Sequence, residues 1–306
     1  MIRLLLILFS IFSPLSLEGS VPIYKKYPFD SSALEKYGEA WLTYKNIYRL
    51  ARIEKRELSF AEREKAIATL KTIYDKEKEW VEIYWLYAGE MFQLAALIDD
   101  ESQLDKAKKW FEKSKVVSRE CLELEKNHSI CKFLLGSSIG KIGTIDGVFS
   151  SMSNGKEVYD LWTDVINSEY NHMLTDRISM QSTVRFAMGI FLRLVPDWIV
   201  LKWLFGVKGD LDRSVEVLEE SMKIDGPFPC GRLMLASSLL CRADGDEKSE
   251  DYRRGIQELE LIPAMDPHTV QSDICKKDSI IMLKDPSLAC GYSTARQQEK
   301  ASKDQL

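Results

Sequence analysis

Hydrophobic residues recur at helical spacing along most of this chain, and the clearest unit runs from Gly206 to Pro229. Its apolar positions fall on one face of a helix: Val215, Leu218 and Met222. Gly209-Asp210 supplies a start signal for this helix, and Gly226-Pro227 supplies a stop. Because apolar helical stretches lie directly before and after it, we expect helix-turn-helix units that follow one another in an array.

The same periodicity predicts helices along the rest of the chain. We expect them over residues 33–57, 60–78, 80–98, 104–124, 130–152, 156–169, 179–195, 198–205, 230–242 and 252–261. Ser31-Ser32 supplies an N-cap signal for the first, and Ser59 with Glu62 forms a capping box for the second. Strand signals are scarce, so the pattern predicts an all-α protein, arranged as a right-handed superhelix of helix-turn-helix pairs.

The change in pattern divides the chain into four segments. Residues 1–19 resemble a secretory signal peptide, with Arg3 before an apolar run over 4–17 and small residues near a cleavage site; the alternative is a retained anchor. Residues 20–32 contain two prolines and predict an extended leader. We expect the helical repeat domain over 33–270, and a C-terminal cap with a polar tail over 271–306.

Composition narrows the class of protein. Apolar residues make up 45% of the 306 residues, so a sizeable core can form. The formal net charge of −5 argues against a nucleic-acid partner, because such proteins are normally basic. The chain contains no phosphate-binding or dinucleotide-binding fingerprint, and we expect no cofactor.

Export to an oxidising compartment would allow the six cysteines to form disulfides, although buried free thiols are the alternative. Cys230 and Cys241 lie near opposite ends of one predicted helix, about 16 Å apart, so they cannot pair with each other. Cys121 and Cys131 flank a short connection between helices, so we expect them to pair. We expect Cys275 to pair with Cys290 in the same way.

The predicted helix over 130–152 carries glycines on one face: Gly136, Gly140, Gly143 and Gly147. Each glycine costs a helix about 1 kcal/mol relative to alanine. Such a cost indicates either tight packing against another helix or space left for a ligand.

The stretch 186–205 is more apolar than one amphipathic stripe requires. Charges at Arg185, Arg193, Asp197 and Lys202 argue against a membrane span, so we expect a buried helix pair kinked at Pro196. Neighbouring repeats, an apolar ligand or a protein subunit would cover it. We predict a cavity or subunit contact lined by some of its aromatic residues: Phe186, Phe191, Trp198 and Trp203.

One motif supports a different class of function. Residues 136–140 fit the G-x-S-x-G pattern of serine hydrolases, with Ser138 as the nucleophile and His172 or His268 as candidate bases. This alternative requires a strand before Ser138, which the pattern does not predict. The three histidines lack partners at metal-ligand spacing, so we expect no metal site.

The recurring units resemble tetratricopeptide repeats, in which small residues let two helices cross closely and large residues fill the groove between units. In one unit the matching positions are Trp85, Ala88, Gly89, Phe92, Ala107, Phe111 and Ser114. In a second unit they are Gly189, Leu192, Ser214, Leu218, Ser221 and Pro227, and this unit has an insertion before its second helix.

Within that class, the chain is similar to the T-component of tripartite periplasmic transporters. Those are exported bacterial repeat proteins whose helices surround a hydrophobic cavity and which associate with a periplasmic solute-binding subunit. Members carry a lipid-anchored cysteine after the signal peptide, and this chain has none there. The resemblance implies a non-enzymatic binding or scaffold protein of the periplasm or cell envelope, with a protein partner, an apolar or organic-acid ligand, or a second copy of itself. A structural envelope protein without a ligand is the further alternative.

Overall fold

The computed structural model describes residues 22–54, 56–98, 100–147, 152–175, 177–266 and 270–292, so the predicted signal peptide and the polar tail lie outside the described residues. Within the described part the chain forms twelve α-helices and two strands of two residues each, which confirms the all-α class. The helices are α1 (Gly38–Ile53), α2 (Phe60–Tyr74), α3 (Val81–Ala96), α4 (Leu104–Leu124), α5 (Ser129–Asp146), α6 (Gly155–Ile166), α7 (Met180–Leu194), α8 (Ile199–Phe205), α9 (Leu211–Asp225), α10 (Pro229–Ala243), α11 (Glu250–Leu261) and α12 (Val270–Lys284).

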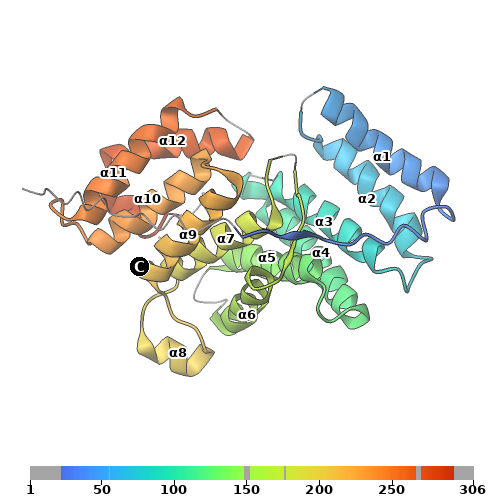
Figure 1. Ribbon diagram of the computed structural model, residues 1–306, viewed down its shortest axis with the longest axis horizontal. Helices are drawn as coiled ribbons and strands as arrows, with labels where there is room; N and C mark the ends of the chain where they lie inside the picture. The colour runs from blue at the N-terminus through green and yellow to red at the C-terminus, as the bar shows by residue number, and fades with distance from the viewer. Residues whose placement is uncertain are drawn as a thin grey trace, which may run out of the picture.

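The helices stack as successive hairpins. Pairs α1–α2, α3–α4, α5–α6, α7–α9 and α10–α11 each pack together, and each pair contacts the next. The first helices α3, α5, α7 and α10 also contact one another in turn, which gives the stack an inner layer. Figure 1 shows α1 and α2 at one end of the molecule and α10, α11 and α12 at the other.

Helix ends follow the signals in the sequence at most positions. The Ser59–Glu62 capping box is present at the start of α2. Asp210 caps α9 by accepting a hydrogen bond from the Arg213 backbone N–H at 2.9 Å. Several expected boundaries are wrong by up to six residues, and two of them differ most. The first helix begins at Gly38 rather than near residue 33, and α5 ends at Asp146 because Gly147 takes a φ of +93°.

Buried serines join neighbouring helices at two equivalent places. Ser114 of α4 donates to the Ala88 carbonyl of α3 at 2.9 Å, and Ser138 of α5 donates to Ser114 at 3.1 Å. The same arrangement recurs in the second half of the stack. There Ser214 of α9 donates to the Gly189 carbonyl of α7 at 2.7 Å and lies 2.9 Å from the Ser238 hydroxyl of α10.

These two serine seams show that α3–α4–α5 and α7–α9–α10 are packed alike. In both, the two hydroxyls belong to residues 24 positions apart. A hydroxyl is small enough to let helix backbones approach, and its hydrogen bond compensates for its burial. The same buried contacts therefore recur in the two halves of the stack.

The leader is extended as expected, and it is bound to the helices. Strand β1 (Lys25–Lys26) pairs in parallel with β2 (Tyr170–Asn171), which lies between α6 and α7. Farther along, the Asp30 carbonyl accepts a hydrogen bond from Trp80 Nε1 at 3.0 Å. The short pairing was not predicted, because two residues are too few to leave a strand pattern in the sequence.

The six cysteines form three disulfides, which indicates an oxidising, exported environment. Cys121 of α4 pairs with Cys131 of α5, as the sequence predicted. The expected pairing of Cys275 with Cys290 is wrong. Cys275 pairs with Cys230, at a Cα–Cα distance of 5.2 Å, and Cys290 pairs with Cys241, at 4.8 Å.

The error over Cys275 and Cys290 has a physical cause. The sequence pattern predicts no helix over residues 270–284, but α12 forms there, with Cys275 inside it and Cys290 beyond its end. At about 1.5 Å of rise per residue, this helix keeps the two cysteines outside disulfide range. Both instead reach the cysteines near opposite ends of α10, and α12 packs along α10 and α11.

His128 is buried beside the leader, with 1% of its surface exposed. Its Nδ1 accepts a hydrogen bond from the Cys131 backbone N–H, which caps α5, and its ring lies 4.5 Å from that of Tyr27. Burial, reinforced by the nearby His172, lowers the pKa of His128 from 6.5 to about 4. The folded protein therefore holds this imidazole neutral.

We expect Gly189→Ala to lower the free energy of unfolding by about 1 to 3 kcal/mol. A Cβ at this position would lie 2.5 Å from Leu218 Cγ, inside the packed α7–α9 contact. Gly89→Ala is the matched control: its Cβ would meet Leu134 at 3.9 Å, an ordinary contact, so the helix-forming alanine should be neutral or stabilising. Urea unfolding measures both, and equal effects of the two substitutions would contradict this packing.

Stability should fall as the pH is lowered from about 6.5 to 4, and His128 should contribute up to about 3 kcal/mol of that fall. The unfolded chain binds the proton near pH 6.5, whereas the folded chain does so only near pH 4. His128→Asn keeps a favourable capping residue and removes the titration. Urea unfolding at pH 7.5 and pH 4.5 should show a smaller difference for the variant, and an unchanged difference would rule out this role.

Candidate functional site

A cavity of about 280 Å³ lies inside the stack between α5, α6 and α7, with α3 contributing Phe92. Most of its lining is apolar, including Phe133, Val158, Trp162, Phe186, Ile190 and Phe191. Polar side chains are few: Ser137, Lys141, Thr144, Asn154 and Thr183. The predicted cavity residues Phe186 and Phe191 therefore do line a cavity.

The glycine face of α5 both packs tightly against another helix and borders open space, which are the two alternatives that the sequence predicted. Gly136 receives the ring of Trp162 so closely that a Cβ would lie 2.7 Å from the indole Nε1. Gly140 contacts the other end of the same ring, and Gly140 and Gly143 both line the cavity. Gly147 belongs to neither group, since it ends the helix. Tight packing at one end of the face thus adjoins open space at the other.

Helix α7 presents two different faces. Its cavity face repeats at helical spacing: Thr183, Phe186, Ala187, Ile190, Phe191 and Leu194. The face toward α9 carries Ser182, Arg185 and Gly189, which bond or pack against that helix. The helical spacing of the cavity face is present in the sequence, but it does not show which of the two faces of α7 adjoins open space.

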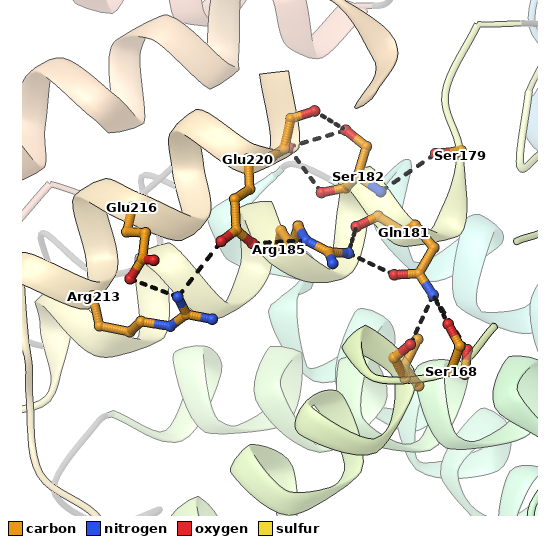
Figure 2. Close-up of polar contacts among 10 residues, drawn as sticks. Ser168, Ser179, Gln181, Ser182, Arg185, Arg213, Glu216 and Glu220 are labelled. Carbon is orange, nitrogen blue, oxygen red and sulfur yellow. Dashed lines mark hydrogen bonds and ion pairs between the residues drawn. The ribbon is translucent and has the colours of Figure 1, made fainter. Parts of the chain in front are cut away.

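A polar network holds α7 in place (Figure 2). The buried Arg185 donates to Glu220 of α9 at 3.0 Å and to the Gln181 side chain at 2.5 Å. Gln181 in turn donates to the carbonyls of Val165 and Tyr170, at 2.8 and 2.9 Å. One chain of hydrogen bonds therefore ties α9, α7 and the end of α6 together, and it fixes the position of the cavity wall.

Lys141 is the one charged residue among the described residues that line the cavity. Burial lowers the pKa of its ammonium below the ordinary 10.5, and no neighbouring acid raises it. The nearby Asp146 pairs instead with Lys108 of α4, at 2.6 Å. The cavity therefore combines an apolar surface with one partly buried cation that has no acid beside it.

Trp198 and Trp203 do not line the cavity, and the expectation that both lie in a buried helix pair is wrong. Their exposed fractions are 56% and 83%. Helix α7 ends at Leu194, and the chain then leaves the stack to form α8 as a separate helix (Figure 1). The chain returns to the stack at Gly209. This glycine lies so close to the Val195 carbonyl that a Cβ on residue 209 would overlap the carbonyl oxygen.

Helix α8 keeps an apolar face exposed. Leu201 is buried in a small cluster with Met152, Val195 and Val207. On the outer side the exposed residues are Trp198, Ile199, Val200, Trp203 and Leu204. No helix within the described residues has the length and apolar character needed to cross a membrane.

The residues considered for other chemistry lie in structural positions. Ser138 is fully buried in the middle of α5 and donates to Ser114, so its motif lies within a helix rather than at the strand-to-helix turn of a hydrolase. Cys121, His128 and Cys131 lie close together, but the two sulfurs are bonded to each other and are not free to bind a metal as thiolates. His268 lies outside the described residues.

We expect Leu201→Ala to destabilise the region around α8 by about 2 kcal/mol, because it removes a buried side chain from the Met152–Val195–Val207 cluster. Trp203→Ala should change the free energy of unfolding by no more than about 0.5 kcal/mol, because the side chain is exposed. Urea unfolding and limited proteolysis of the 196–208 segment compare the two. A large loss of stability on Trp203→Ala would contradict the exposed position.

Comparison with known proteins adds no further constraint on this site. No protein-family model matches the sequence, and a search of curated proteins finds no significant match. What the site can do must therefore be argued from its own geometry: an apolar cavity, one cation and an exposed apolar helix.

Proposed function

We propose that this protein is an exported, non-enzymatic binding protein that holds an apolar small molecule. The observation that supports it is the cavity of about 280 Å³ with its mainly apolar lining. Ligand sites in proteins are concave and mostly apolar, with a few polar groups that orient the ligand. The cavity lies between helices that are closely packed elsewhere, so a ligand would fill space that the protein leaves empty.

The proposed location is the periplasm or cell envelope. The three disulfides support an oxidising compartment, and the resemblance to exported tetratricopeptide proteins supports a bacterial envelope. The two equivalent serine seams support an array of such repeats, which we propose to form a right-handed superhelix. The resemblance to the T-component of tripartite transporters further suggests a role in solute uptake.

The proposal includes a protein partner, for which a periplasmic solute-binding subunit is the candidate. The exposed apolar face of α8 is the surface proposed for it, because contiguous apolar patches on a protein surface mark interaction sites. This face adjoins the cavity through Val195, which belongs both to the cavity lining and to the cluster beneath α8.

Ala187→Phe tests the proposal by filling the cavity from α7. We expect binding of the neutral dye N-phenyl-1-naphthylamine to weaken at least about tenfold, because the added ring takes the space of the ligand. Thermal stability should be kept. Ala61→Phe, at an exposed site on α2, is the matched control and should leave dye binding unchanged.

Fluorescence titration measures both variants, and circular dichroism checks their fold. If the wild-type protein does not bind the dye, or if Ala187→Phe binds it as tightly as Ala61→Phe does, the cavity is not a ligand site. Native mass spectrometry of the exported protein, before and after mild organic extraction, provides a second measure of a bound small molecule.

A further inference from the structure

The polar residues on the cavity side of α5 follow one line along the helix. Ser137, Lys141 and Thr144 are spaced four and then three residues apart, so they share a face, and all three line the cavity. Gly140 and Gly143 flank Lys141 and add no side chain that would shield it. The cavity therefore has one polar strip along α5, on which Lys141 stands between Ser137 and Thr144.

Lys141 is partly buried, and its surroundings differ from those of the well-buried arginines in the described part of the chain. Arg63 pairs with Glu90 at 3.1 Å, and Arg185 pairs with Glu220 at 3.0 Å. Arg193 donates to the carbonyls of Ala289 and Cys290 at 2.7 and 2.9 Å. Lys141 has no such acceptor among the described residues, and only burial acts on its pKa.

Placing an ammonium beside apolar groups without a counter-ion costs free energy, because the charge loses hydration. An anion bound beside it would offset that free-energy cost. A neutral or cationic ligand would leave the cost in place. A ligand with several charges would bring more negative charge than the single cation of the lining can balance. The remaining surface of the cavity is apolar and suits a hydrocarbon body.

We propose that Lys141 binds the carboxylate of an apolar organic acid, so that the ligand of this cavity is an amphipathic monoanion. Its hydrocarbon part lies among Phe186, Ile190 and Phe191, and its carboxylate accepts hydrogen bonds from Lys141, with Ser137 and Thr144 beside it. This inference rests on the proposed function of the cavity and adds the chemical class of the ligand.

The test compares decanoate with decanol, and 2-naphthoate with 2-naphthol, by displacement of N-phenyl-1-naphthylamine. Wild-type protein should bind each carboxylate at least about tenfold more tightly than its neutral counterpart, in keeping with a hydrogen bond between charged groups in a poorly hydrated site. A preference for decanoate over 2-naphthoate would identify a chain as the hydrocarbon part, and the reverse preference would identify a ring.

Lys141→Met should abolish the preference for the carboxylate and leave the affinity for decanol within about threefold. Lys141→Gln repeats the test with a polar neutral side chain, should the methionine variant fold poorly, and Lys141→Arg should retain the preference. Lys132→Met is the matched control on the same helix: its ammonium pairs with Asp164 at 2.6 Å, and it does not line the cavity, so the preference should persist.

The outcomes separate this inference from the proposed function. If neither carboxylates nor alcohols displace the dye, or if the dye itself does not bind, the proposed function fails and this inference fails with it. If alcohols and carboxylates bind equally, and Lys141→Met changes neither, the cavity remains a ligand site but Lys141 is not its anion-binding group.

Discussion

The close approach of neighbouring helix backbones is the constraint on which this structure depends. Ser114 and Ser214 sit where a larger side chain would separate the helices, and each donates to a carbonyl of the preceding first helix. The buried hydroxyl thus has a partner, and the small side chain lets large neighbours such as Leu218 fill the remaining space. The same contact occurs in both halves of the stack.

The cavity forms where this close packing is interrupted. Trp162 packs into the surface left open at Gly136 and Gly140 and holds α6 against α5. Beyond the ring, Gly143 and Ala187 place no large side chain between α5 and α7. The network around Arg185 fixes α7 from its other side, so α7 cannot move inward to close the space (Figure 2). Small residues therefore produce close contact in one place and empty volume in another, according to what lies opposite them.

Disulfides tie the C-terminal end to the stack, and backbone pairing ties the leader to its middle. The C-terminal helix α12 is joined to α10 through Cys230–Cys275, and the segment that follows it through Cys241–Cys290. The leader passes over the helices near α3 and pairs with the segment between α6 and α7. These long-range links connect segments that no local pattern relates. The leader in particular fixes the segment between α6 and α7, two helices that line the cavity.

The sequence by itself determined most of the helices but not α12, because periodicity and capping are local properties of the chain and α12 has only a weak pattern. It identified α4 with its observed ends, the cap at Asp210, the Cys121–Cys131 pair and the aromatic residues Phe186 and Phe191. Only the tertiary structure decided that Trp198 and Trp203 face outward, that Cys275 and Cys290 bond to α10, and that Lys141 faces an apolar cavity without a counter-ion. Hydrophobic residues are not all buried, and the surroundings of a side chain depend on which distant segments pack against it, so periodicity along one helix cannot reveal them.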